Sequence, residues 1–278
     1  MSTLQTTTSS SRPSAQAGDT YFETDTKNII VYDGSNWRGY VSDGIPFGKG
    51  STSADFDGVD DYISVADADN LSFGDGSNDS PFSLAAWVKQ DAAGCRILCK
   101  TFENDLEYAF TVGGNNIVGL SLYDGDYNNR IQANHQNALN PGLNKWYHVA
   151  ATYDGSGSVS GITNYLDGNL VSSTAVSFGS YTAMHNTSTP LDIGRLNLTI
   201  SGTNYESFTN GQFDDVAVIA KELTADEVTA IYNSNSYPLE LVSLWRFEGN
   251  ANDSFGSNNG TNNGTNNGPT DLNAAARS

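Results

Sequence analysis

The sequence predicts an all-β protein, a sandwich of sheets with one short helix and a small N-terminal β-meander. Glycine, serine, threonine, asparagine and aspartate are abundant, aromatic residues make up 11%, and strong helix formers are sparse. Turn signals such as Asp-Gly recur at short intervals between apolar runs, with the spacing of a jelly roll. A length of 278 residues accommodates one large β domain of roughly 200–250 residues plus a small appendage.

The N-terminal part divides into a tail and a small module. Residues 1–17 are rich in serine and threonine and lack periodicity, which predicts a flexible or partner-ordered tail. Residues 18–45 predict a meander whose three strands lie at 20–24, 29–32 and 37–41, separated by polar turns. Three short strands cannot bury a core alone, so we expect residues 18–45 to serve in attachment or oligomerisation.

Residues 46–278 are expected to form the large domain. The apolar or alternating stretches predict strands at 82–89, 145–153, 191–195 and 211–220. Residues 165–171 predict a hairpin around Asp167-Gly168. One helix is predicted after Leu223, because Thr224 and Glu227 form a capping box. Its apolar stripe includes Val228, and Asn233 can end it.

Four motifs in this order resemble laminin G-like domains, which have the concanavalin A-like lectin/glucanase jelly roll. They are Phe56-Asp57-Gly58-Val59-Asp60-Asp61-Tyr62, Trp146-Tyr147-His148-Val149, Tyr165-Leu166-Asp167-Gly168, and Asp214-Asp215-Val216 followed by Leu223-Thr224 and Glu227-Val228. The resemblance covers most of residues 50–235 and implies a concanavalin A-like jelly-roll sandwich. Such domains often hold calcium in comparable loops.

The C-terminal part departs from this family pattern. Residues 241–261, which include Leu244, Trp245 and Phe247, resemble the piece that normally begins such a domain. We expect a circular permutation in which this first strand returns to the sheet beside Phe56, in cis or on a neighbouring protomer. The alternative is the truncated start of a second repeat. Residues 258–278 are expected to be a low-complexity tail.

A second resemblance concerns residues 17–37. Their order, Gly18-Asp19 with Tyr21, then Val31-Tyr32-Asp33-Gly34 and Trp37, is similar to a β module of tail-fibre and other virion proteins of tailed bacteriophages. The resemblance implies a virion protein, assembled in the host cytoplasm, that contacts other virion proteins through its N-terminal segment. A small meander behind a polar tail is consistent with the packing of a fibre, so we expect a homo-oligomer, with a trimer favoured.

The charge excludes several partners. A formal net charge of −19 disfavours nucleic acid and anionic membranes, because phosphates require lysine and arginine. We expect no membrane insertion, since no apolar run approaches the roughly 20 residues that span a bilayer. Residues 1–16 lack the apolar core of a secretory signal peptide.

The acidic turn at residues 55–65 is the predicted cation site. Asp57 and Asp60 lie in this turn, and Asp214 or Asp215 on a late strand would join them if the strands were neighbours. Carboxylate and carbonyl oxygens are the ligands that Ca²⁺ prefers. The alternative is that these aspartates only shape turns and cap strands.

A second acidic loop is the predicted carbohydrate site. Tyr123, Asp124, Asp126 and Tyr127 combine aromatic rings, on which sugars stack, with carboxylates that accept hydrogen bonds from hydroxyls. The alternative is a plain rim of the sheet, where exposed tyrosine is common.

Enzymatic chemistry is not expected. Glu103, Asp105 and Glu107 have the spacing of a glycosidase carboxylate motif, but their neighbours suggest a solvated acidic loop. His148 has no paired nucleophile and is expected to pack within a sheet. Cys95 and Cys99 are expected to be free buried thiols, because four residues of strand span about 13 Å.

These observations together predict a non-enzymatic structural protein of a tailed-phage virion. It would be a head or tail fibre, a decoration protein or a knob that displays a lectin-like domain for adhesion to host-surface glycans. The alternative is a bacterial secreted or surface polysaccharide-binding module, or less well supported, a glycosidase.

Overall fold

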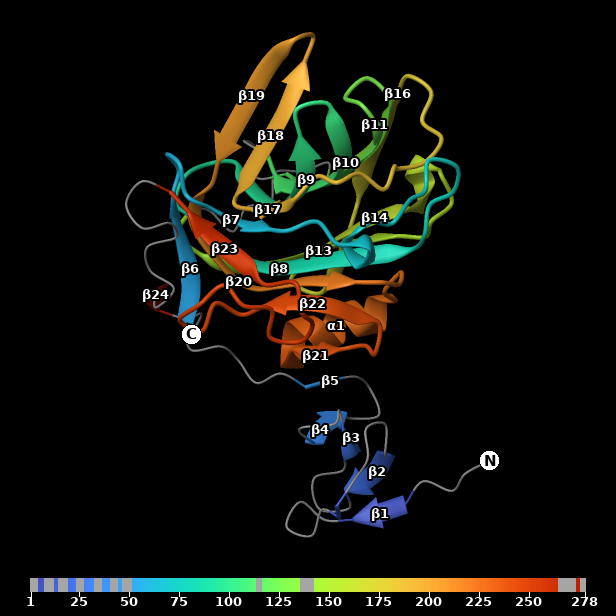
Figure 1. The fold of residues 1–278 in the computed structure, drawn as a ribbon, viewed down its shortest axis with the longest axis vertical. Coiled ribbons are helices and arrows are strands. Elements are labelled where there is room, and N and C mark those ends of the chain that lie inside the picture. The colour runs from blue at the N-terminus through green and yellow to red at the C-terminus, as the bar shows by residue number, and fades with distance from the viewer. Residues whose placement is uncertain are drawn as a thin grey trace.

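The computed structural model describes most of the large domain and short pieces of the rest of the chain (Figure 1). The described residues are 52–113, 117–135 and 143–264, with 5–7, 13–14, 20–23, 28–32, 37–40, 45–46 and 274–275.

Two eight-stranded, largely antiparallel sheets form the large domain, which confirms the predicted all-β jelly-roll sandwich. The first, called the arm-side sheet, has the order β16 (Ser173–Phe178), β12 (Arg130–His135), β11 (Val118–Gly125), β10 (Asp105–Val112), β9 (Cys95–Phe102), β17 (Leu191–Ile193), β7 (Tyr62–Val65) and β23 (Gly260–Asn263). The second, called the helix-side sheet, has the order β15 (Asn169–Val171), β14 (Ile162–Leu166), β13 (Trp146–Tyr153), β8 (Phe82–Gln90), β20 (Asn210–Ile219), β6 (Thr52–Asp57) and β24 (Ala274–Ala275), with β22 (Leu241–Trp245) also paired to β20.

The main core lies between the two sheets. Along β10, Tyr108, Phe110 and Val112 belong to this core, whereas Ala109 belongs to a separate cluster on the outer face. This is the two-residue period of a strand with both faces covered. Two single-turn 3-10 helices, η1 (Asp69–Leu71) and η2 (Val159–Gly161), lie in the connections.

Each sheet carries a different element on its outer face. Helix α1 (Ala225–Ser234) packs on the helix-side sheet through Val228 and Ile231, and the β18 (Arg195–Ile200) and β19 (Thr203–Phe208) hairpin, called the arm, lies on the other side of the sandwich (Figure 1). The capping box predicted at Thr224 and Glu227 is present. The helix continues beyond the predicted Asn233 and is capped by Asn235, which adopts the left-handed conformation that asparagine tolerates.

The C-terminal strand returns to the sheet in the same chain. β22 pairs with β20 between Val216 and Ile219, and β6 pairs with the neighbouring part of β20. The hydroxyl of Thr52, at the start of β6, donates a hydrogen bond of 2.7 Å to the carbonyl of Phe247. β22 therefore follows β6 along the same edge of β20 and does not pair with β6, the strand that contains Phe56.

The three strands predicted in the N-terminal meander are present. They are β2 (Thr20–Glu23), β3 (Asn28–Tyr32) and β4 (Trp37–Tyr40), joined in antiparallel pairs. Within the predicted tail, β1 (Gln5–Thr7) adds to β2 in parallel. Further along, β5 (Ile45–Pro46) pairs with β21 (Ser236–Tyr237).

Cys95 and Cys99 are free and buried, as predicted. Burial raises the pKa of each thiol to about 12, so both stay protonated at neutral pH.

None of the helices in the described part of the chain is long and apolar enough to cross a membrane.

Candidate functional site

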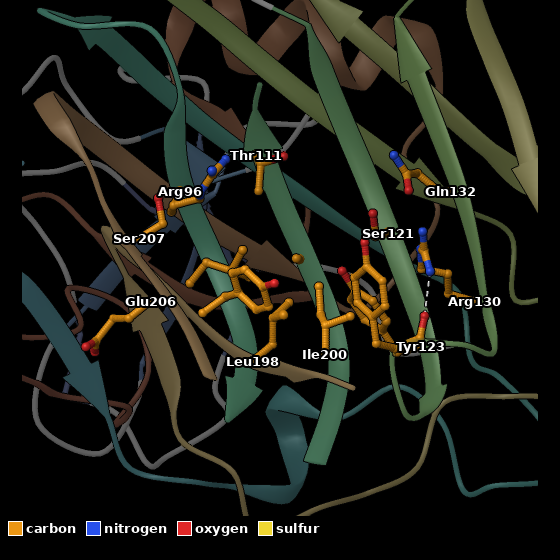
Figure 2. Close-up of a pocket in the computed structure, with 14 residues that line it drawn as sticks. Arg96, Thr111, Ser121, Tyr123, Arg130, Gln132, Leu198, Ile200, Glu206 and Ser207 are labelled. Atoms are coloured by element: carbon orange, nitrogen blue, oxygen red, sulfur yellow. Dashed lines mark hydrogen bonds between the residues drawn. The ribbon is translucent and has the colours of Figure 1, made fainter. Parts of the chain in front are cut away.

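A pocket of about 350 Å³ lies between the arm and the outer face of the arm-side sheet (Figure 2). Its floor comes from β9, β10, β11 and β12, and its wall comes from β18 and β19. The volume lies at the lower end of the roughly 300–1,000 Å³ typical of small-ligand sites.

The arm is held over the sheet by an apolar contact. Leu198 on β18 is buried against a cluster that includes Cys99, Ala109 and Tyr123 on the sheet. Leu196 and Ile200 alternate with polar residues on β18 and pack at the edge of the same cluster. Because β18 follows a two-residue period, one of its faces covers part of the sheet and leaves a cavity beside it.

Two tyrosines form the aromatic wall of the pocket. The rings of Tyr123 and Tyr127 stack with centroids 6.3 Å apart. Burial raises the pKa of Tyr123 to about 12, so its hydroxyl keeps its proton at neutral pH and can donate a hydrogen bond. A third tyrosine, Tyr205 on the arm, lines the pocket and is 51% exposed.

Arg130 is fixed behind these rings. Its guanidinium lies 4.1 Å from the ring centre of Tyr127 and 3.6 Å from that of Phe178. It also donates a hydrogen bond of 2.5 Å to the carbonyl of Tyr127 (Figure 2). Planar stacking of this kind holds an arginine in one orientation.

The structure places the four residues of the predicted carbohydrate site in two different settings. Tyr123 and Tyr127 line the pocket, but Asp124 and Asp126 do not. Asp124 accepts hydrogen bonds from His185 and from the backbone of Thr182. Asp126 accepts hydrogen bonds from the backbone N–H groups of Asn128 and Asn129 in the following turn. Both carboxylates therefore organise loops.

Sequence reasoning missed the polar floor residues and the arm residues of the pocket. The missed residues on the floor are Arg96, Arg130 and Gln132, and those on the arm include Tyr205 and Glu206. The alternation of Leu196, Leu198 and Ile200 before the turn at 201–202 was a usable signal for a hairpin. Nothing local in the sequence places that hairpin over β9–β12.

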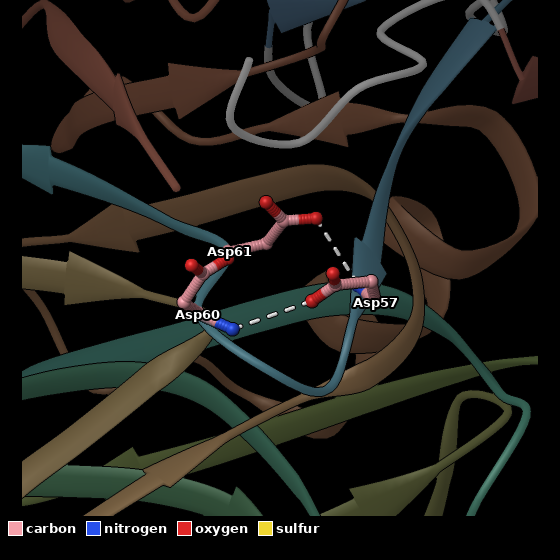
Figure 3. Close-up of side chains that lie close together, drawn as sticks. All are labelled: Asp57, Asp60 and Asp61. Atoms are coloured by element: carbon pink, nitrogen blue, oxygen red, sulfur yellow. Dashed lines mark hydrogen bonds between the residues drawn. The ribbon is translucent and has the colours of Figure 1, made fainter. Parts of the chain in front are cut away.

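A group of three carboxylates lies in the acidic turn between β6 and β7 (Figure 3). Asp57, Asp60 and Asp61 each offer an oxygen, and these oxygens lie within 4.8 Å of one another. Burial, followed by repulsion from neighbouring aspartates, raises the pKa of Asp61 to about 6. The prediction named Asp57 and Asp60, and the structure adds Asp61.

Asp214 and Asp215 lie away from this group. Asp57 pairs with Asn210 on β20, and Asp214 is four residues further along, about 13 Å. Asp215 is buried at an irregularity of β20, has a φ of 47°, and accepts hydrogen bonds from Arg246 and Asn235. Within the described residues, the carboxylate oxygens suited to a hard cation are those of Asp57, Asp60 and Asp61.

The carboxylates considered for glycosidase chemistry do not share one environment. Glu103 and Asp105 are exposed at the turn between β9 and β10, as expected for a solvated loop. Glu107 is different, because it is fully buried on β10 and lies 2.7 Å from the ammonium of Lys100, which is also fully buried. The expectation of a solvated loop is therefore wrong for Glu107.

His148 packs within the helix-side sheet, as expected. Its ring lies edge-on to Trp87 with a centroid separation of 5.4 Å, and it is also close to Tyr232 of α1.

The chain belongs to the concanavalin A-like lectin/glucanases superfamily, whose family model matches residues 57–229. No curated protein sequence matches the chain.

The chain is similar to several solved structures, and the first of them shows the same fold. A candidate carbohydrate-binding protein from Bacteroides ovatus is 20% identical, with a TM-score of 0.54, and the alignment covers 90% of this chain and 69% of that one. A heptameric SAP-like pentraxin from Limulus polyphemus is 18% identical, with a TM-score of 0.44 and coverage of 73% and 94%. The CBM40 domain of a Ruminococcus gnavus IT-sialidase is 14% identical, with a TM-score of 0.40 and coverage of 68% and 96%.

Proposed function

We propose that this protein is a non-enzymatic structural component of a tailed-phage virion and that it binds host-surface glycans in the pocket under the arm. The observation that carries the proposal is the pocket itself, where tyrosine rings stand beside polar side chains on the outer face of a lectin-type sandwich. Sugars bind to such surfaces by stacking on aromatic rings while their hydroxyls form hydrogen bonds.

Carbohydrate binding also agrees with the description of the Bacteroides ovatus protein that shares this fold. Tyr123 and Tyr127 present a stacked aromatic wall, and Gln132 and Ser121 lie on the neighbouring strands of the floor. Amide and hydroxyl groups of this kind both donate and accept hydrogen bonds, which suits sugar hydroxyls. The mode of binding would be shallow contact on a rigid sheet, with no covalent step.

The virion assignment rests on the N-terminal segment. Residues 17–37 resemble a phage fibre module, and β2, β3 and β4 form the meander expected there. We propose that residues 18–45 attach the protein to other virion proteins as a homo-oligomer, with a trimer favoured. The large domain, residues 46–278, would face outward, and the order of β6 and β22 along β20 supports residues 241–261 as a permuted first strand.

A glycan array probed with the full chain tests the binding proposal. We expect binding to at least one class of glycan, and we expect Tyr127→Ala to abolish it. The control is Tyr232→Ala, which removes a ring on the opposite outer face. Binding that survives Tyr127→Ala unchanged would place the site elsewhere, and absence of binding to all glycans would refute the proposal.

Mass spectrometry of purified virions tests the virion assignment. We expect peptides of this chain in particles, and their absence would favour the alternative of a bacterial polysaccharide-binding module.

The non-enzymatic assignment has its own test, which is incubation with β-glucans. Product that disappears in Glu103→Gln would contradict it.

We also propose that the acidic turn binds calcium through Asp57, Asp60 and Asp61. Three mutually close carboxylates repel one another, and a divalent cation would relieve that repulsion. We expect EGTA to lower the melting temperature of protein loaded with calcium. No change in melting temperature would count against a structural ion.

A further inference from the structure

The arm-side pocket contains two positive charges that no carboxylate of the described residues neutralises. Arg96 on β9 and Arg130 on β12 both line it, and neither takes part in an ion pair among the described residues. The chain has 13 basic and 32 acidic residues, so carboxylates are plentiful overall. Two unpaired arginines in one pocket are therefore notable in this protein.

The acidic groups close to the pocket are already engaged. Glu206, the carboxylate in the pocket wall, lies 3.0 Å from Arg195, which also pairs with Asp192. Asp124 pairs with His185 at 2.9 Å. The positive charge of Arg96 and Arg130 is thus left for a ligand.

Arg96 also has an unused donor. Its Nε is buried and has no hydrogen-bond partner among the described residues. A buried donor without a partner is unfavourable, and a charged one more so, which makes an oxyanion at this position strongly stabilising. Figure 2 shows Arg96 at one side of the pocket, with Arg130 on the far side.

The spacing of the two arginines matches an extended ligand. The strand order β9, β10, β11, β12 separates Arg96 and Arg130 by three strand spacings, about 14 Å across the sheet. The register aligns Arg96 with Asn134 on β12 through Thr111 and Gly119, so Arg130 is also offset by four residues, about 13 Å along the strand. Tyr123 and Tyr127 lie on the Arg130 side of this span. An oligosaccharide can stack on the partly exposed ring of Tyr127, which the buried ring of Tyr123 backs, while its acidic group reaches Arg96.

We infer that the pocket selects acidic glycans, in which a carboxylate or sulfate on the sugar binds the guanidinium of Arg96 while Arg130 adds positive charge at the tyrosine side. This inference rests on the proposed glycan-binding function and names the ligand class. Arginine is suited to this role because its planar fork binds two oxygens of one anion.

Calorimetry on the full chain with matched sugar pairs tests the inference. The pairs are oligogalacturonate and its methyl ester, sialyllactose and lactose, and a heparin tetrasaccharide and its desulfated form. The first two pairs report on a carboxylate and the third reports on a sulfate. We expect the acidic member of at least one pair to bind about tenfold or more tightly than its neutral partner, with an affinity that falls as salt rises.

Arg96→Gln and Arg96→Lys identify the residue responsible. We expect Arg96→Gln to remove the preference for the acidic member and to leave the affinity for the neutral member unchanged, and Arg96→Lys to restore part of the preference. Lys145→Gln removes the same charge at an exposed position outside the pocket and should change nothing.

The outcomes separate the two proposals. Equal binding of acidic and neutral members in every pair, or a preference that survives Arg96→Gln, overturns the inference while glycan binding stands. If none of the six sugars binds, the inference is overturned, and the glycan array then decides separately whether glycan binding stands.

Discussion

The two outer faces of the sandwich are covered in different ways. On the helix-side sheet, α1 brings Val228 and Ile231 into a continuous apolar cluster, and Trp87 stacks on Tyr232 at 5.5 Å. On the arm-side sheet, a two-stranded hairpin makes a smaller cluster centred on Leu198 and leaves a pocket of about 350 Å³.

The difference lies in the shape and composition of the covering element. A helix presents a broad apolar stripe that fills the space over a sheet, whereas one strand of a hairpin presents only every second residue. The helix-side face therefore contributes mainly stability. The arm-side face retains exposed aromatic and charged groups beside a rigid floor, the arrangement that a binding site requires.

The largest expected effect concerns the buried ion pair of the arm-side sheet. Lys100→Met should lower the free energy of unfolding by about 3–5 kcal/mol, because it leaves the buried carboxylate of Glu107 without its cation. Lys221→Met, which breaks an ion pair about 30% exposed near α1, should cost no more than about 1 kcal/mol. Urea denaturation of both variants measures the difference, and equal losses would contradict this account of burial.

The helix-side face provides the next effect. Ile231 is fully buried, so Ile231→Ala should lower the free energy of unfolding by about 2–5 kcal/mol through lost apolar contact and a residual cavity. Glycan affinity of the folded variant should stay unchanged, as measured by calorimetry below its melting temperature. A fall in affinity would show that the two faces are coupled.

The sequence was sufficient for the fold class, the capping box, the free thiols and the meander strands, because each depends on local periodicity or on a few adjacent residues. It was sufficient to single out Tyr123 and Tyr127, which line the pocket, because their residue type is recognisable in the sequence. It could not assign Asp124 and Asp126 to their loops or bring Arg96 to Tyr127, because those contacts depend on tertiary packing and strand order.

The same limit applies to the acidic groups. Asp214 and Asp215 look equivalent to Asp57 in sequence, but the pairing of Asp57 with Asn210 separates them along β20. Glu107 looks like a member of a solvated acidic run, but it lies within β10 and is buried beside Lys100 of β9.

The acidic turn joins the helix-side sheet to the arm-side sheet through β6 and β7, and it should make the stability of the fold depend on pH. The folded protein holds the proton of Asp61 up to about pH 6, whereas the unfolded chain loses it near 3.8. Between these values the folded state binds more protons, so stability should fall as pH rises from about 4 to 6. Asp61→Asn should flatten this fall and stabilise the protein at pH 7 in the absence of calcium, as measured by melting temperature against pH. If Asp61→Asn left the pH profile of the melting temperature unchanged, the raised pKa of Asp61 would not be the cause of the pH dependence.

The smallest expected effect on stability comes from the exposed edge of the arm. Tyr205 is 51% exposed, so Tyr205→Ala should change the free energy of unfolding by no more than about 0.5 kcal/mol. The same change should weaken glycan binding, because the ring lines the pocket. Leu170→Ala, at an exposed apolar residue of the helix-side sheet, is the matched control and should leave binding intact. Unaltered binding in Tyr205→Ala would limit the site to the floor of the pocket.

Hydrogen–deuterium exchange of the full chain, with and without the strongest glycan found on the array, tests most directly whether the arm-side face is the binding face. We expect the glycan to slow exchange in residues 118–135, which form part of the floor, and in residues 195–208 of the arm. Residues 225–234 of α1 should be unaffected. Protection confined to α1 or to the acidic turn at 57–61, with none under the arm, would contradict the central claim.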